Sequence, residues 1–387
     1  MRSEPAGRAP LRSTPIAGRR PHLRTRSCRL PFVALATALC AIAAGCGGSG
    51  SSGPVARDFV GLSPSGVLAE HGAARDRDLR AIAATGAGIV RQRFDWALVE
   101  RRPGRFDLST YDDIVAATSR ADLDVLPILF LPPSFRASGS GGSNPNTVFP
   151  PRRDADMGRF AAVLARRYGP RGTFWSAHPS VPKHPIRAWQ VWNEPNLPVY
   201  WGGRPDAAAY VRMLRAVGGA LKRVDPGALV VSAGLPDSTV GVPLLRYLKA
   251  MYDAGAKGAL DVLAIHPYAV DAKGALAGVQ SARGLLTRVG DGVPIWVTEV
   301  GWASGGPPSA FTVDPEGQAQ RITQMLTELA SRRRELGVRG VVYFTWQDVS
   351  APAAQDFFGL HTGLLGVDGR RKPAYAAWVK AVKSITS

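Results

Sequence analysis

Short apolar runs alternate with segments of helical periodicity along the chain after residue 57. Eight of these runs have the length and the β-branched or aromatic content of buried strands. They cover residues 58–62, 88–91, 123–131, 186–193, 228–233, 260–266, 294–299 and 341–346. Continuous apolar strands are typical of a parallel sheet that is covered on both faces.

The segments between the runs predict helices. Apolar residues recur at helical spacing over 206–224, where Asp206 stands at the position of an N-cap, and again over 322–329. A last helix is expected over 374–382. Eight strand–helix units in about 330 residues predict a single (β/α)8 TIM barrel over 57–387.

Two features of the loops and strands qualify this pattern. Pro127 lies inside the third run and removes a backbone donor, so we expect that strand to be short or bulged there. Segments 137–149 and 175–185 are expected to be long loops.

Composition narrows the chemistry. The 387 residues are 45% hydrophobic, enough for one large core. The three cysteines, Cys28, Cys40 and Cys46, all lie near the N-terminus, so the rest of the chain has no disulfide, thiolate metal site or cysteine nucleophile. The six histidines show no metal-ligand spacing, and we expect neither a metal nor a cofactor.

The N-terminus predicts export. Eight arginines precede an apolar run over 31–44 that is too short to span a bilayer, and small residues then lead to Cys46 and a Gly/Ser-rich stretch. We predict a signal peptide over 1–45 and a tether over 46–56. The pattern resembles a bacterial lipoprotein signal, with Cys46 lipidated on the outer side of the cell membrane. Such signals usually carry Leu where Ala43 stands, and cleavage after Ala43, giving a secreted protein, is the alternative.

The formal net charge of +18 includes this leader. Residues 1–45 hold eight arginines and one glutamate, so the remaining chain keeps +11. A basic surface could attract an anionic glycan or lipid headgroup, but arginines on solvated helix faces, as at 332–334, explain the charge equally simply. No basic motif interleaved with aromatic residues is present, so nucleic acid is not an expected partner.

Two of the apolar runs end on a glutamate. Glu194 follows the fourth run and Glu299 ends the seventh. A carboxyl group at the mouth of an apolar strand is partly desolvated, which raises its pKa and suits it to donate a proton. Two carboxyl groups on separate strands are the minimum that cleavage of a glycosidic bond requires.

Other polar and aromatic residues occupy the same ends of their strands. They are Arg91, Asn193, His266, Tyr268 and Trp346. These residues and the two glutamates could also be structural. The glutamates could pair with structural arginines, Arg91 could cap a helix, and Trp346 could belong to the core. Because the carboxyl ends of barrel strands meet at one face, their joint position there favours a site.

Aromatic residues after the strands are candidates for stacking on sugar rings. Trp201 and Trp302 follow the fourth and seventh runs, and Trp96 follows the second. An ordinary buried aromatic is the alternative for each, and the preferred one for Trp96.

The motifs Trp-Asn-Glu-Pro-Asn at 192–196 and Thr-Glu-Val-Gly-Trp at 298–302 resemble those of clan A glycoside hydrolases. The resemblance covers nearly all of the chain after the leader and is closest to families five and thirty-nine. It implies a retaining enzyme on a TIM barrel. Family five usually offers a histidine after strand three, where this chain reads Leu-Pro-Pro-Ser at 131–134.

The resemblance also implies roles. Glu194 would be the general acid/base and Glu299 the nucleophile, with Asn193 hydrogen-bonded to the sugar hydroxyl next to the anomeric carbon. A cation and a phenol, Arg91 and Tyr268, would keep the pKa of Glu299 low while apolar neighbours raise that of Glu194.

For the remaining candidates the resemblance places Trp346 as the apolar floor under the sugar and His266 among the substrate-binding residues. Arg91 rather than Arg93 is chosen from its spacing to Trp96.

The expected function is that of an exported, monomeric, retaining β-glycoside hydrolase acting on an oligo- or polysaccharide. Its two carboxyl groups should then lie about 5–5.5 Å apart. A transglycosylase that remodels cell-envelope glycan would use the same two acids. A non-catalytic glycan-binding lipoprotein is a further alternative, although both glutamates stand in intact motifs.

Overall fold

The computed structural model describes residues 54–64, 68, 72–140 and 146–387. Its strands form one parallel sheet in the order β5-β4-β3-β2-β1-β9-β8-β7-β6. The strands are β1 (Val60–Leu62), β2 (Ile89–Asp95), β3 (Asp124–Phe130), β4 (Ala188–Val191), β5 (Leu229–Val231), β6 (Leu235–Pro236), β7 (Leu263–His266), β8 (Ile295–Val297) and β9 (Val338–Tyr343). Each of the eight predicted strands is present.

The sheet closes on itself at its two outermost strands, which are consecutive in the chain. β5 pairs with β4 and ends at Val231, while β6 pairs with β7 and begins at Leu235. Between them, Val231 forms a parallel bridge with Val262, just before β7. The fifth strand of the barrel is therefore interrupted, and the predicted (β/α)8 fold is confirmed.

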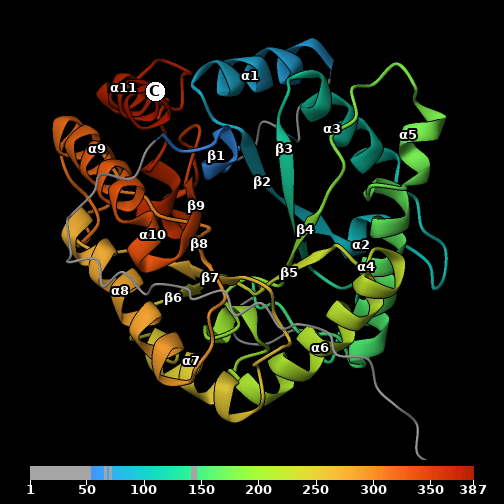
Figure 1. The fold of residues 1–387 in the computed structure, drawn as a ribbon. Coiled ribbons are helices and arrows are strands. Elements are labelled where there is room, and N and C mark those ends of the chain that lie inside the picture. The colour runs from blue at the N-terminus through green and yellow to red at the C-terminus, as the bar shows by residue number, and fades with distance from the viewer. Residues whose placement is uncertain (1–53, 65–67, 69–71, 141–145) are drawn as a thin grey trace, which may run out of the picture. The chain divides into compact units, whose positions relative to one another are not determined.

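Helices surround the strands (Figure 1). They are α1 (Gly72–Ala84), α2 (Trp96–Val99), α3 (Ser109–Arg120), α4 (Asp154–Tyr168), α5 (Thr173–Ala177), α6 (Ala207–Val224), α7 (Leu244–Asp253), α8 (Ala272–Arg288), α9 (Pro315–Ser331), α10 (Arg333–Leu336) and α11 (Pro373–Thr386). The expected cap of α6 is confirmed, because the Asp206 side chain accepts from Ala209 N at 2.9 Å. None of these described helices has the length and hydropathy that crossing a membrane requires.

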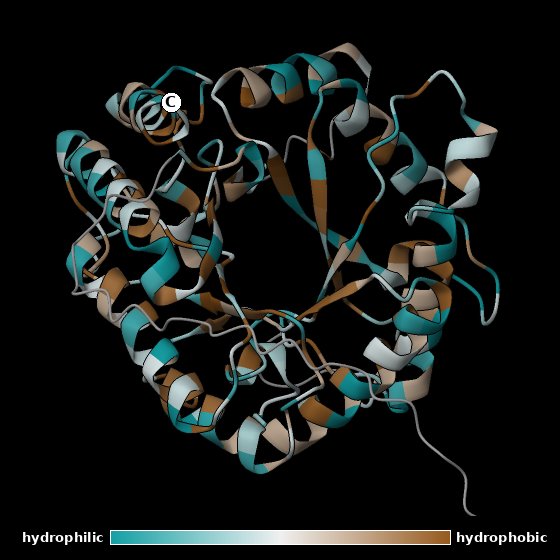
Figure 2. Ribbon diagram, in the orientation of Figure 1, coloured by the Kyte–Doolittle hydropathy of each residue, from teal (hydrophilic) through white to brown (hydrophobic). Residues whose placement is uncertain are grey.

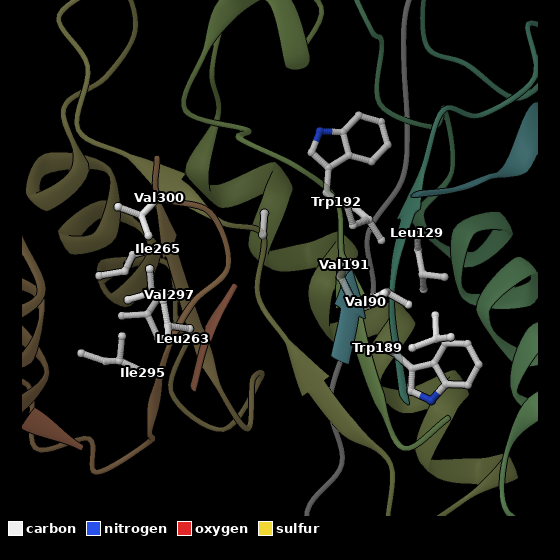
Figure 3. Close-up of a cluster of buried hydrophobic side chains, with 14 of the residues drawn as sticks. Val90, Leu129, Trp189, Val191, Trp192, Leu263, Ile265, Ile295, Val297 and Val300 are labelled. Atoms are coloured by element: carbon white, nitrogen blue, oxygen red, sulfur yellow. The ribbon is translucent and has the colours of Figure 1, made fainter. Parts of the chain in front are cut away.

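Side chains alternate between two buried clusters along each strand. The larger cluster contains strand residues such as Val90 and Leu129 (Figure 3). Apolar side chains of the helices belong to the same cluster. The smaller one, with Leu126, Ala264 and Trp296, draws its members from strands and their immediate ends, so it fills the barrel interior. The strands are accordingly largely hydrophobic, whereas the helices mix hydrophilic and hydrophobic residues (Figure 2).

Two sequence-based expectations about the strands are wrong. β2 continues to Asp95, so Arg91 lies inside this strand rather than after it. β3 passes through Pro127 in regular register with Gln92, and is neither short nor bulged there. Within the predicted tether, Val55 is buried and its N–H donates to Ile385 O at 2.8 Å.

The predicted signal peptide, Cys46 and most of the tether lie outside the described residues.

Candidate active site

The residues predicted to form a site lie at the carboxyl ends of the barrel strands. Asn193 and Glu194 follow β4, His266 ends β7, and Glu299 comes two residues after β8. Arg91 reaches the same place from within β2. Closure of the barrel thus brings together residues that are up to 208 positions apart in the sequence.

Both oxygens of the Glu299 carboxylate are held by neighbours. Arg91 Nη1 forms an ion pair with Oε1, and Tyr268 OH donates to Oε2 at 3.0 Å. Burial alone would raise the pKa of Glu299, but the charge and hydrogen bond of Arg91 and the hydrogen bond of Tyr268 lower it below its ordinary value. Glu299 is therefore held ionised.

Glu194 has a different environment. Its Oε1 lies 2.7 Å from His266 Nδ1, and no described residue hydrogen-bonds its Oε2. Burial raises the pKa of Glu194, the His266 contact and Arg91 lower it, the charge of Glu299 raises it, and the net result is a pKa above the ordinary value. Glu194 is suited to hold a proton.

The turn after β4 has an unusual backbone. Trp192 and Glu194 both adopt left-handed conformations, with φ of 77° and 45°. Such angles are costly for bulky side chains and persist only where the surrounding structure enforces them. Here Glu194 N donates to Gly234 O at 3.2 Å, and Trp192 Nε1 donates to Tyr200 O at 2.8 Å.

Arg91 connects the two glutamate strands. Its guanidinium binds Glu299 and also donates from Nη2 to Asn193 Oδ1 at 2.8 Å. An arginine can only donate, so the Asn193 amide oxygen must face it. The Asn193 Nδ2, for which no described residue is an acceptor, remains available to a ligand.

Two buried polar residues that lie beneath this site were not among the predicted site residues. Gln190 accepts from Arg91 Nε at 2.7 Å and donates to Thr298 Oγ1 at 3.1 Å. Thr298 Oγ1 in turn lies 3.0 Å from His266 Nε2. A signal existed: Gln190 is a polar residue at an inward position between Trp189 and Val191, which face the helices.

The tryptophans proposed as sugar contacts are buried. Trp302 is 0% exposed and donates from Nε1 to Ala269 O, and Trp201 is 5% exposed and packs edge-on against Trp192. Trp346 is also buried. For these three the structure favours the core alternative, since none offers an open face to a ligand. Trp96 is also buried, in agreement with the core position that the sequence favoured for it.

A groove of about 650 Å³ opens at the carboxyl end of β3. Its lining includes Arg93, Phe130, Phe149 and Tyr200. Burial and the charges of Glu194 and Glu299 raise the pKa of Tyr200, which places this phenol near the pair. Tyr200 was not among the predicted site residues, and with Phe149 it is one of two half-buried aromatic residues that line the groove.

Among the described residues, one group of three His or carboxylate side chains could converge on a metal ion. Single ligand atoms of Glu194, His266 and Glu299 all lie within 4.8 Å of one another. The guanidinium of Arg91 already binds Glu299, and its charge would oppose a cation there. We therefore treat the group as a paired-carboxyl site rather than a metal site.

Comparison with known proteins agrees with the geometry. Residues 173–363, which include both glutamates, match the family model of the glycosyl hydrolase catalytic core. No curated protein sequence matched the chain.

Solved structures share the fold. A family 39 glycoside hydrolase from Bacteroides cellulosilyticus superimposes with a TM-score of 0.60 at 19% identity, over 85% of this chain and 64% of that chain. A family 39 β-xylosidase from Caulobacter crescentus superimposes with a TM-score of 0.60 at 20% identity, over 85% of this chain and 72% of that chain. An exo-β-1,4-mannosidase from an Opitutaceae bacterium superimposes with a TM-score of 0.55 at 19% identity, over 84% of this chain and 59% of that chain.

The chain thus spans roughly two thirds of the length of the family 39 enzymes, and at these identities the likeness concerns the fold. The chain is thus similar to the glycosyl hydrolase catalytic core over residues 173–363, which hold both glutamates, and it shares its barrel fold with glycoside hydrolases of known structure.

Proposed function

We propose that the protein is a retaining β-glycoside hydrolase in which Glu299 is the nucleophile and Glu194 the general acid/base. The observation that carries this proposal is the asymmetry of a close pair: one carboxyl has a lowered pKa and the other a raised one. One oxygen of each carboxyl group lies within 4.8 Å of an oxygen of the other, which fits the close spacing of the carboxyl groups in a retaining enzyme.

The reaction has two balanced steps. The Glu299 carboxylate attacks the anomeric carbon, the glycosidic C–O bond breaks, and the proton of Glu194 passes to the departing oxygen. Glu194, now ionised, then takes a proton from water, whose oxygen displaces Glu299 and restores both groups. Asn193 Nδ2 is placed to donate to a sugar hydroxyl during both steps, because Arg91 holds its amide oxygen.

The substrate class follows from the site and its relatives. The groove beside Tyr200 is open and lined by polar and aromatic residues, as binding a sugar requires. The named enzymes of similar fold act on β-xylosides and β-1,4-mannosides. We propose a β-linked oligo- or polysaccharide as the substrate.

We also propose, from the sequence alone, that the protein is exported and anchored to the outer side of the cell membrane through a lipid on Cys46.

Two alanine variants test the roles of the glutamates. With an aryl glycoside whose phenol departs without protonation, Glu194→Ala should still form the glycosyl–enzyme, which accumulates because no base activates water. Azide needs no general base, so it should restore turnover and yield the β-glycosyl azide. Glu299→Ala should lose on the order of 10⁴-fold in turnover, and azide could give it only the α-anomer.

The exposed Glu328→Ala in α9 is the control and should keep normal activity. If the two azide patterns were exchanged, the roles would be reversed. Full activity in either site variant would refute the proposed mechanism.

A further inference from the structure

A row of buried polar side chains runs inside the barrel beneath the two glutamates. It leads from Arg91, which binds Glu299, through Gln190 and Thr298 to His266, which contacts Glu194. The residues of this row expose at most 3% of their surface. Buried polar atoms must satisfy one another, so the direction of each hydrogen bond can be worked out.

The row has a fixed starting point, because an arginine can only donate. Arg91 Nε lies 2.7 Å from Gln190 Oε1, which is therefore the acceptor. The amide of Gln190 cannot be reversed without losing this bond. Its Nε2 consequently faces Ser232 O at 3.2 Å and Thr298 Oγ1 at 3.1 Å and donates to both.

The direction then continues through the hydroxyl of Thr298. This hydroxyl has one proton and two lone pairs, and Gln190 uses one lone pair. Its other polar contact in the described part of the chain is His266 Nε2 at 3.0 Å. Had Nε2 carried a proton, two donors would face Thr298 Oγ1, and the hydroxyl proton would have no acceptor in a fully buried place. An unmatched buried donor is costly, so the hydroxyl donates to an unprotonated Nε2.

We infer that Gln190 and Thr298 are positioning residues which hold His266 neutral, with its proton on Nδ1, so that His266 donates to Glu194 Oε1. The Nδ1 atom lies 2.7 Å from this oxygen and 3.7 Å from Glu299 Oε2, so the proton belongs to the Glu194 contact. The acid proton of Glu194 is then placed on the other oxygen, Oε2. The link to catalysis rests on the proposed function, whereas the tautomer does not.

A neutral imidazole helps to keep the pKa of Glu194 above that of Glu299. The titratable and charged groups that face Glu194 are Arg91 from β2, Tyr200 after β4, His266 and Tyr268 at the end of β7, and Glu299 after β8. An imidazolium among them would lower the pKa of both glutamates. A neutral Nδ1–H stabilises the ionised form of Glu194 by a hydrogen bond only, so Glu194 can regain its proton in each cycle.

The tautomer is measured directly on the full chain with ¹⁵N-labelled histidine. Two-bond nitrogen–proton correlations distinguish the two ring nitrogens, and the signals of His266 are assigned by their loss in His266→Gln. Near neutral pH we expect Nδ1 to carry the proton and Nε2 to be bare. A wild-type His266 that is protonated on Nε2, or on both nitrogens, would overturn the inference even if the enzyme is active.

Thr298→Val removes the hydroxyl at nearly constant shape. His266 can then place its proton on Nε2 and turn a lone pair toward Glu194, which favours the protonated carboxyl. We expect a mixed tautomer signal and a basic limb of kcat/KM that moves up by about one pH unit. Thr298→Ser, which keeps the hydroxyl, should restore both the wild-type tautomer and the wild-type limb.

A matched control is the buried Thr118 of α3, whose hydroxyl donates to Ile114 O at 3.0 Å, far along the chain from the site. Thr118→Val should alter stability without moving the limb or the His266 signals. An unchanged tautomer and limb in Thr298→Val would refute the positioning role. Absence of glycosidase activity in the wild type would instead refute the proposed function. The nitrogen spectrum of His266 would still test the tautomer in that case.

Discussion

At the scale of single residues, the site gives two identical side chains different properties. Glu299 contacts a cation and a phenol through its two oxygens, and Glu194 contacts one imidazole. Their side chains are about equally exposed, 12% for Glu194 and 13% for Glu299, so the difference in pKa comes from their partners and not from exposure. The same difference in pKa predicts that the two glutamates contribute to stability with opposite dependences on pH.

Glu194→Gln should stabilise the protein as pH rises. The folded-state pKa of Glu194 is raised, so the stability that it contributes is fully present below its unfolded pKa and is lost as pH rises through the folded value. The variant escapes this loss, which amounts to about 1.4 kcal/mol for each pH unit that separates the unfolded and folded pKa values. Its gain in Tm over wild type should be absent near pH 4 and grow toward pH 8.

Glu299→Gln is the matched comparison and should behave in the opposite way. The folded-state pKa of Glu299 is lowered, so its contribution is present above the unfolded pKa and is lost as pH falls through the folded value. Without it Arg91 is a buried charge that lacks its anion, and a loss of about 3–5 kcal/mol is expected at neutral pH. Urea unfolding of both variants across pH would contradict the assignment if the signs were the same.

At the scale of elements, the interrupted fifth strand shapes the site. The chain leaves the sheet after β5 and rejoins it at β6, and Gly234 in the gap lies against His266. A Cβ on Gly234 would be 1.9 Å from His266 Nε2. The gap therefore makes room for the imidazole that contacts Glu194.

Gly234→Ala should displace His266 and cost stability at once. Overpacking of this kind costs about 1–3 kcal/mol, and turnover should fall because Glu194 loses its partner. Gly292→Ala is the control, since a Cβ there meets nothing within 4 Å and its stability should change by less than about 1 kcal/mol. Calorimetry with a kinetic assay checks both; an active, stable Gly234→Ala would show that His266 has freedom to move.

At the scale of the whole molecule, the barrel separates two kinds of interior. An apolar layer that includes Leu126 and Trp296 fills its centre, and the polar row from Arg91 to His266 lies above it. The site is thus a desolvated polar layer supported by a rigid apolar one. Such support fixes geometry and strengthens electrostatic interactions.

The placement of the molecule in the cell is a prediction from its leader. If Cys46 carries a lipid, Cys46→Ala should release the protein from the membrane fraction with its glycosidase activity intact, because a Gly/Ser tether separates anchor and barrel. Cys40→Ala, within the predicted signal peptide, should remain in the membrane fraction. A mature N-terminus at Ala44 would contradict lipidation.

Much of this protein could be predicted from local patterns. The eight strands, the cap at Asp206 and the two glutamates at strand ends are signals within short windows, because strand and helix periodicities depend on neighbouring residues. Position at the end of a barrel strand then implies a shared face. The resemblance of the motifs around Glu194 and Glu299 added the roles that we propose for them.

What tertiary structure alone decided are relations between distant segments. The interruption between β5 and β6, the pairing of Gln190 with Thr298, and the covering of Trp201, Trp302 and Trp346 all depend on which side chains meet across the barrel. A tryptophan after a strand has the same local sequence whether it faces a sugar or a helix. The strands and their carboxyl ends are therefore properties of the sequence, and the partners that raise the pKa of one glutamate and lower that of the other are properties of the closed barrel.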